Sequence, residues 1–512
     1  MYTVLDTTMR DGAQHNKISF SVEDKLGIAE ALEQLDVDFI EYGAPSFDIE
    51  TKDFENRTKL SPDKLVAFGM TARAGTEPER DEGILKLIAA KGNYVSLVGK
   101  SDRRHVEKVL RTDAGEYLNN IRKSVATITK SGKKVIFDAE HFFDGYAYDR
   151  DYAMASLAAA AEGGAEILNL CDTNGGSLPA AIRTAVSECK KTFSVTIGIH
   201  AHNDAGLATA NTLAALEEGA EHVQGTLLGL GERSGNAALS TILPLMKRLG
   251  LKDLPGLNLL TPVCRTVAEI SNIAIPDSAP YIGAAAFTHK AGLHADGVLK
   301  ESDTFEFISP ESVGNVRRLV LSKQAGRHLV RSKLEGVIPE ATEPEILSKV
   351  YAALKEREAL GYTFEAAEAS FYIMAARLSG RKVDFFKTVD YTVIDSSDAL
   401  SHAKAEISVD GVTVSAKADG NGPVHALDLA MRECMLKFFP AMDSVSLVDY
   451  KVRVIDPKSA TGARVRVSIT STDGKRTWKT IGVSGNVVHA SFIALEDSYR
   501  FALNDDFNGL FA

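Results

Sequence analysis

The chain is poor in cysteine, with four in 512 residues. These cysteines lie far apart in the sequence, and no two of them form a Cys-x-x-Cys pair. Such spacing argues against a disulfide-stapled scaffold and against a thiolate zinc site. A chain of this length is too long for one ordinary hydrophobic core, so we expect two or three domains. The cysteines are Cys171, Cys189, Cys264 and Cys434.

Long apolar runs, a basic leader and a positive net charge are also missing. No apolar stretch reaches the length of a membrane span, and the N-terminus enters a strand-like run, Tyr2 to Leu5, directly. We therefore expect a cytoplasmic protein with no membrane partner. The formal net charge of -11 lacks the basic footprint of nucleic-acid binding, so no nucleic-acid partner is expected. An anionic substrate would need local positive charge from arginine or a metal.

Residues 1 to 250 alternate short apolar segments, typical of buried parallel strands, with segments of helical periodicity. Eight such units in about 250 residues predict a closed (β/α)8 barrel, a TIM barrel in the α/β class. A doubly wound open sheet is the alternative, although no Gly-x-Gly-x-x-Gly follows an early strand. The predicted strands are Thr3–Thr7, Asp38–Tyr42, Leu65–Gly69, Tyr94–Val98, Lys134–Glu140, Ile167–Asp172, Val195–His200 and Val223–Leu228.

The segments between the predicted strands favour helices. Val22 to Leu35 has apolar side chains spaced for one helical face, and Asp151–Ala161 and Leu207–Leu216 are rich in alanine. The stretch from Val106 to Thr129 is longer, and we expect it to be broken.

Polar side chains gather where the predicted strands end. Catalytic residues of a TIM barrel lie at the C-terminal ends of its strands, so these positions mark a candidate active site. Random placement would scatter them along the chain. In chain order they are Arg10-Asp11-Gly12, Glu41, Asp138 to His141, Asp172 to Gly176, His200 with His202, and Gly231 to Asn236.

Asp11, His200 and His202 form a candidate metal site. The two histidines are two residues apart on a strand, so their imidazoles project from the same face. Without a carboxylate, such a pair is more often two hydrogen-bonded histidines. With Asp11 they make a mixed set that suits Mg2+, Mn2+, Co2+ or Zn2+ and leaves positions open for substrate oxygens. Asn236 follows a glycine-rich turn, and it either completes this set or caps a helix.

Three further side chains have a candidate role around a 2-oxo acid, whose keto carbon the metal would make electrophilic as a Lewis acid. Arg10 would stabilise the negative charge that develops on the keto oxygen. The alternative is that Arg10 forms a surface ion pair with Asp11. Thr173 would hydrogen-bond the substrate carboxylate. The alternative, which does not exclude that role, is that Thr173 or Asn174 caps the helix expected near Pro179. Glu140 is a candidate acid and base, with a structural ion pair as the alternative.

Several segments together resemble the metal-dependent acyl-CoA condensing enzymes, the family of 2-isopropylmalate, homocitrate and citramalate synthases. The resemblance extends over nearly the whole chain. Within the family, Asp138–Tyr146 and Gly361–Phe371 resemble the longer citramalate synthases. The segments that carry the family resemblance are Leu5–Gly12, Leu170–Gly176, His200–Asp204, Gly231–Asn236 and His289–Gly297.

The resemblance implies that acetyl-CoA and pyruvate condense to (R)-citramalate and CoA, in the biosynthesis of isoleucine and branched-chain amino acids. Hydrolysis of the thioester would make the reaction irreversible. His294 would be the base toward the acetyl methyl group. The residue roles implied are metal binding by Asp11, His200 and His202, pyruvate contact by Arg10 and Thr173, and proton transfer by Glu140 and His294.

The chain departs from the family at Phe305, where a tyrosine is frequent before the turn Ser309-Pro310-Glu311. Either another group such as Tyr281 supplies that hydroxyl, or the step it assists is slower or different. Three alternatives stay open. They are the same condensation on a larger 2-oxo acid, as in 2-isopropylmalate or homocitrate synthase, a lyase or aldolase reaction on the same barrel, and a catalytically weakened amino-acid sensor.

The regular alternation ends after Pro255. We expect residues 1–255 to form the catalytic barrel, and residues 256–384 a helical linker subdomain that completes the active site. A helix over Glu345–Leu360 is expected there, with Gly361 as its stop. Residues 385–512 are expected to form an α+β regulatory domain.

The last 128 residues contain an internal repeat. Val424-His425-Ala426 recurs as Val488-His489-Ala490, 64 residues later, and each copy follows a Gly/Asn turn. This predicts a duplicated strand–strand–helix unit. The strands expected around the two helices are Tyr391–Ile394, Lys404–Val409, Val412–Ala416, Tyr450–Ile455, Arg464–Ser471 and Thr477–Val483.

This repeat resembles the regulatory domain of isopropylmalate and citramalate synthases. The resemblance implies a homodimer that binds an end-product amino acid at its interface. Isoleucine would be the effector of a citramalate route, with leucine as the alternative. A purely structural dimerisation domain is the other interpretation, because fold alone does not imply function. We expect His425 and His489 to be packing or capping residues.

Overall fold

A computed structural model describes residues 2–45, 50–290, 292–321, 325–395, 397, 400–455 and 462–510. The chain divides into two compact units. The first contains residues 1–287 and 308–316, and the second contains residues 288–307 and 317–512. The finer division at residues 255 and 384 stays a prediction.

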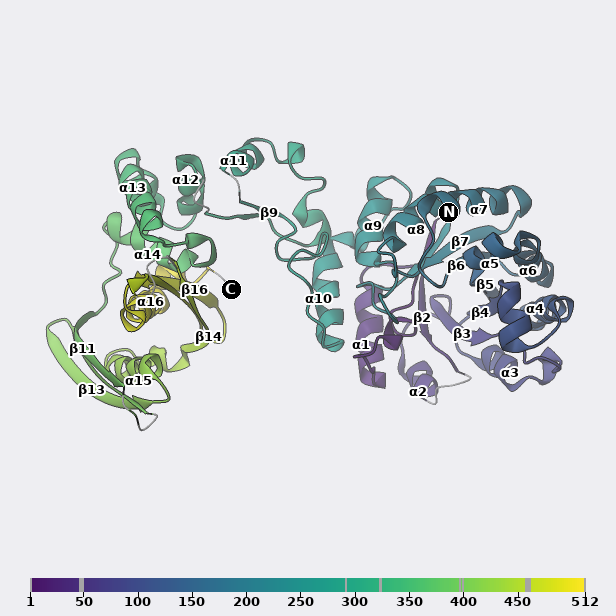
Figure 1. Ribbon diagram of the computed structural model, residues 1–512, viewed down its shortest axis with the longest axis horizontal. Coiled ribbons are helices and arrows are strands. Elements are labelled where there is room, and N and C mark those ends of the chain that lie inside the picture. The colour runs from purple at the N-terminus through teal and green to yellow at the C-terminus, as the bar shows by residue number, and fades with distance from the viewer. Residues whose placement is uncertain are drawn as a thin grey trace. The chain divides into compact units, whose positions relative to one another are not determined.

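The first unit contains a closed barrel of eight parallel strands in sequence order, wrapped by helices (Figure 1). Closure is made by β1 and β8, which pair from Thr3 with His222 to Asp6 with Gly225. The TIM barrel is therefore confirmed and the open sheet is wrong. The strands are β1 (Thr3–Asp6), β2 (Phe39–Gly43), β3 (Leu65–Met70), β4 (Tyr94–Lys100), β5 (Lys134–Glu140), β6 (Ile167–Asp172), β7 (Thr196–Ala201) and β8 (His222–Gly225).

The helices of this unit follow the predicted periodicity. A capping box between Ser21 and Asp24 starts the first helix, since each side chain accepts a hydrogen bond from the other residue's backbone N–H. The stretch predicted to be broken is a π-helix over His105–Leu110 and then a separate α-helix. The helices are α1 (Val22–Glu33), α2 (Glu50–Arg57), α3 (Glu82–Ala89), α4 (Ala114–Lys130), α5 (Phe142–Tyr148), α6 (Arg150–Gly163), α7 (Pro179–Thr192), α8 (Ala208–Glu217), α9 (Leu239–Arg248) and α10 (Leu260–Ile270).

Apolar side chains pack the barrel in two layers. The larger layer lies between strands and helices, and includes Val4, Leu97 and Ile121. A separate cluster of six buried residues, from β1 to β6, fills the inside of the barrel. Successive strand residues alternate between these layers, as Val4 and Leu5 do, so inward positions are set by the period of two. The inner cluster is Leu5, Phe39, Val66, Tyr94, Ile136 and Ile167.

The second unit combines helices with two three-stranded antiparallel sheets, ordered β11-β12-β13 and β14-β15-β16. The predicted helix is α13 (Pro344–Leu360), and Gly361 ends it at a φ of 106°. The other elements are β9 (Thr288–His289), α11 (Gly292–Lys300), β10 (Arg318–Leu319), α12 (Arg327–Glu335), α14 (Glu368–Leu378), β11 (Lys387–Asp395), β12 (Ser401–Val409), β13 (Val412–Gly420), α15 (Pro423–Leu436), β14 (Ser446–Val454), β15 (Val465–Thr472), β16 (Thr477–Ser484) and α16 (Val487–Ala502).

The internal repeat is present as two units of three strands and one helix, so the duplication is confirmed. The two edge strands β11 and β14 share a Val-Asp-Tyr segment, at Val389 and at Val448. In both strands the pairing register shifts at that valine, which is therefore a β-bulge. Both valines are solvent-exposed, at 51% and 57% of their surface. Among the described residues, no helix is long and apolar enough to cross a membrane.

Candidate active site

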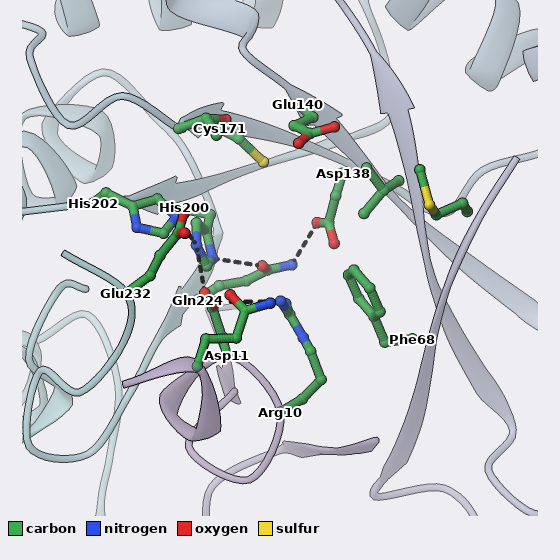
Figure 2. Close-up of a pocket in the computed structure, with 14 residues that line it drawn as sticks. Arg10, Asp11, Phe68, Asp138, Glu140, Cys171, His200, His202, Gln224 and Glu232 are labelled. Atoms are coloured by element: carbon green, nitrogen blue, oxygen red, sulfur yellow. Dashed lines mark hydrogen bonds and ion pairs between the residues drawn. The ribbon is translucent and has the colours of Figure 1, made fainter. Parts of the chain in front are cut away.

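Asp11, His200 and His202 converge at the C-terminal ends of β1 and β7. Their ligand atoms all lie within 4.8 Å of one another, and all three residues are buried. Nε2 of His200 lies 3.1 Å from a carboxylate oxygen of Asp11 and 3.3 Å from Nε2 of His202 (Figure 2). The structure therefore brings together the three residues that the sequence predicts as metal ligands.

Local backbone structure sets this convergence. Asp11 lies in the tight turn after β1, where its N–H donates to the carbonyl of Thr7 at 2.8 Å. His200 is the penultimate residue of β7, and His202 follows the strand in a β-bridge with Asn236. The two imidazoles consequently point to the same side, as the period of two requires.

The charges of the cluster match a divalent cation. Burial and the positive charge of His200 lower the pKa of His202 to about 3, so its imidazole is neutral near pH 7. Burial opposes the charge on Asp11, but Arg10 and His200 outweigh it and hold the pKa of Asp11 well below its usual range. Burial alone would lower the pKa of His200, but the carboxylate of Asp11 outweighs burial and raises that pKa overall. An ionised carboxylate beside imidazole nitrogens is a common donor set for such a metal.

Arg10 is held by three neighbours. Its Nε donates to Glu41 at 2.6 Å, its Nη1 lies 3.3 Å from Asp11, and its guanidinium stacks 3.9 Å from the ring centre of Phe68. Burial lowers the pKa of Arg10, yet the charges of Glu41 and Asp11 raise it overall, so the side chain stays cationic. The predicted ion pair of Arg10 with Asp11 is present, but it lies at the barrel mouth with the Arg10 side chain only 13% exposed, so it is not a surface pair.

Thr173 and Glu140 also line the cavity. The Thr173 hydroxyl accepts the backbone N–H of His141 at 2.8 Å, which leaves its own hydrogen available to a ligand. Thr173 does not cap α7, because Leu178 precedes that helix and no side chain caps it. Glu140 forms an ion pair with Lys100 and also borders the cavity, so the predicted ion pair is present and the acid–base role stays a prediction.

Asn236 is buried beside His202. Its Nδ2 donates to the carbonyl of Leu230 at 2.8 Å, and its Oδ1 is buried without a hydrogen-bond partner. The capping interpretation is wrong, because α9 begins at Leu239. The loop that leads into Asn236 requires glycine at position 235. The φ of Gly235 is 85°, and a Cβ there would lie 2.0 Å from the backbone oxygen of Gly229. The orphaned Oδ1 beside His202 suits a fourth ligand.

His294 lies in α11 of the second unit and is exposed. Its ring is tilted against that of Phe305, with ring centres 5.5 Å apart. Tyr281, named as a substitute for the missing hydroxyl, belongs to the first unit. The roles of His294 and Tyr281 therefore stay predictions. Ala291 of the His289–Gly297 segment lies outside the described residues.

The cavity at the barrel mouth has a volume of about 230 Å³. Some of its lining was missed from the sequence, because single residues within strands form no recognisable spacing. Only Gln224 left a signal, since it alternates with Val223 as a polar residue in a buried strand. A second cavity of about 400 Å³ shares Met70 and Val98 with the first. The lining residues that were missed are Gln14, Phe68, Met70, Val98 and Gln224.

Comparisons with known proteins agree with this geometry. Residues 2–267 match the HMGL-like family, residues 281–359 the homocitrate synthase post-HMGL domain-like family, and residues 365–503 the LeuA allosteric (dimerisation) domain. An (R)-citramalate synthase of Aquifex aeolicus is 44% identical over 98% of each chain. One of Streptomyces coelicolor is 40% identical over 98% of this chain and 96% of that one.

A more distant relative is the probable 2-isopropylmalate synthase of Methanopyrus kandleri, which is 32% identical over 95% of each chain. The resemblance seen in the sequence is thus confirmed. The chain belongs to the HMGL-like family of condensing enzymes, and within it to the (R)-citramalate synthases.

Proposed function

We propose that the chain condenses acetyl-CoA with pyruvate to give (R)-citramalate and free CoA. The observation that carries the proposal is the buried cluster of Asp11, His200 and His202 beside Arg10, in a chain that aligns over nearly its full length with (R)-citramalate synthases. The 2-isopropylmalate synthase relative is less similar, which favours pyruvate over a larger 2-oxo acid.

Each side chain around the cavity has a task in this reaction. A divalent cation held by Asp11, His200, His202 and Asn236 would supply Lewis-acid polarisation of the keto group. Arg10 stabilises negative charge on the keto oxygen as the new carbon–carbon bond forms. Thr173 donates its hydroxyl hydrogen to the pyruvate carboxylate. Water then cleaves the thioester and CoA leaves.

Glu140 and His294 are assigned the proton transfers. Glu140 borders the cavity and forms an ion pair with Lys100, so its carboxyl group lies where a substrate proton could be transferred. His294 is assigned the removal of a proton from the acetyl methyl group. Replacing His294 with asparagine should lower kcat while the Kd for Mn2+ stays unchanged, which separates it from the metal ligands.

We assign the CoA arm to the second cavity, of about 400 Å³ at the ends of β3 and β4. It adjoins the pyruvate cavity through Met70 and Val98, and Arg73 and Lys86 line it. The lining also includes Lys100 and two carboxylates, Glu82 and Asp81, of which Asp81 caps α3. Cations beside apolar side chains suit a thioester arm that ends in phosphates. Lys86→Ala should raise the KM for acetyl-CoA about two- to fivefold, as expected for one exposed charge, and leave the KM for pyruvate unchanged.

The second unit is assigned dimerisation and feedback inhibition. Its match to the LeuA allosteric (dimerisation) domain and the exposed valines on β11 and β14 support a homodimer. Isoleucine is the proposed effector, and leucine is the alternative. Inhibition by leucine at concentrations where isoleucine has no effect would contradict this choice.

The deciding experiment measures release of CoA thiol from acetyl-CoA with a panel of 2-oxo acids. Pyruvate should give the fastest release. No release with pyruvate, together with release from 2-oxoisovalerate or 2-oxoglutarate, would overturn the proposal. A chelator should abolish the activity, and Mn2+ or Mg2+ should restore it.

A further inference from the structure

We propose that Gln224 and Asp138 are positioning residues for His200. Together they hold a hydrogen on Nδ1 of that imidazole and leave its Nε2 free to bind a divalent cation. The inference rests on the metal-binding role that the proposed function gives to Asp11, His200 and His202.

A chain of buried hydrogen bonds links the three residues across β7, β8 and β5. Nδ1 of His200 lies 3.0 Å from Oε1 of Gln224, and Nε2 of Gln224 lies 2.8 Å from Oδ1 of Asp138. Figure 2 shows Gln224 between the imidazole and the carboxylate. No more than 6% of any of the three residues is exposed, so water does not replace these bonds.

The direction of these hydrogen bonds follows from Asp138, whose carboxylate only accepts hydrogen bonds. Its Oδ1 also accepts the side-chain amide of Asn169 at 2.8 Å, and its Oδ2 accepts the hydroxyl of Ser96. A reversed Gln224 amide would set its carbonyl oxygen against that carboxylate, which costs a hydrogen bond in a buried place. The carbonyl oxygen of Gln224 therefore faces His200, and Nδ1 of His200 must carry the hydrogen.

The consequence lies on the opposite side of the ring. With its hydrogen on Nδ1, a neutral His200 has its lone pair on Nε2, the atom nearest to Asp11 and His202. Partners that fix the tautomer of a metal-binding histidine typically change metal affinity 10–100-fold when they are removed. Gln224 and Asp138 occupy that position here, although neither belongs to the predicted ligand set.

Mn2+ binding to the full-length protein tests the inference without relying on turnover. Titration with Mn2+, followed by the electron paramagnetic resonance signal of the free ion, gives a Kd for each variant. Gln224→Leu should raise the Kd 10–100-fold. The matched control is Asn211→Leu, which removes another buried side-chain amide, one that bonds Asp172 and the carbonyl of Ser177 outside the cavity. It should change the Kd less than twofold.

A compensating pair protects the test against simple misfolding. Gln224→Glu alone sets two carboxylates together and should weaken Mn2+ binding. The double variant Gln224→Glu with Asp138→Asn restores a donor opposite the introduced glutamate, and its Kd should return to within about threefold of the parent value.

The outcomes are separable. No Mn2+ binding by the parent protein would overturn the metal site itself, and the inference with it. Normal binding by the parent and an unchanged Kd in Gln224→Leu would overturn the positioning role alone. If Gln224→Leu does not fold, failure of the double variant to bind better than Gln224→Glu overturns the inference, and recovery supports it.

Discussion

The barrel mouth and the edge strands of the second unit differ in which side chains they bury and which they expose. In the barrel, charged side chains such as Asp11 and Glu41 are buried and held by partners from several strands. In the second unit, apolar side chains such as Val448 are exposed on an edge strand. Burying charge is costly unless the charge is paired and hydrogen-bonded, and exposed apolar side chains at matching positions of two edge strands offer a surface for association. The first arrangement suits chemistry, and the second suits association.

The largest effect is expected at the metal ligands of the barrel. His202→Ala removes one of the three clustered donors, so activity should fall at least about 100-fold, beyond the usual cost of losing a supporting partner. Turnover with saturating Mn2+ measures this. The control is His222→Ala, which removes a buried histidine of β8 that bonds Thr3 outside the cavity. Normal rates in His202→Ala would refute the site.

Arg10→Lys should have the next largest effect. Lysine keeps the charge but loses the planar group that bonds Glu41 and stacks on Phe68. We expect kcat to fall about 10²–10³-fold, the range for removing one donor to a developing oxyanion. Steady-state kinetics with pyruvate and acetyl-CoA measure it. Arg57→Lys on the surface of α2 is the control, and equal kcat values in the two variants would contradict the role.

The second unit is tested by placing charge on its edge strands. Val389→Lys with Val448→Lys puts two cations on exposed bulges, which should shift the dimer toward monomer and weaken inhibition by isoleucine while kcat stays the same. Sedimentation velocity and inhibition curves measure this. Val109→Lys, an equally exposed position in the barrel unit, should change neither. A dimer unaffected by the double change would locate association elsewhere.

The smallest effect concerns the pH dependence of stability. Burial raises the pKa of Asp6 to about 7, against an ordinary value of 3.8. The folded chain therefore binds this proton more tightly than the unfolded chain, and stability falls as pH rises from about 4 to 7. Asp6→Asn should remove that loss, so its melting temperature should exceed the parent value at pH 8 more than at pH 5. An equal difference at both pH values would contradict it.

Much of the barrel is predictable because parallel strands and their helices have distinct periods. The His200 and His202 pair is predictable for the same reason, since two residues on a strand share a face. Gln224 and Phe68 are different. Their positions depend on the register of β8 and β3 against their neighbours, which the spacing within one strand does not contain. The capping alternatives for Thr173 and Asn236 failed because Leu178 and Ala238 are the residues directly before the two helices, and no side chain caps either helix.

The second unit also shows the limit of reading domains from composition. Helix α14 is rich in buried residues and packs on α16 and β16, and the Ser370 hydroxyl accepts the backbone N–H of Ile481 at 3.1 Å. A shortened chain that ends before Val383 would keep α14 but lose β16 and α16, which would expose the apolar surface of α14. The lysine substitutions on the edge strands are therefore the cleaner test of regulation.

Closure of the barrel through β1 and β8 has a consequence for synthesis of the chain. Thr3 pairs with His222, so more than 200 further residues must be synthesised before both edges of β1 are hydrogen-bonded. Until then the growing sheet keeps two open edges, which invite pairing with other chains. Asp11 and His200 share this delay, so uptake of metal at this site would mark the moment at which the nascent barrel closes.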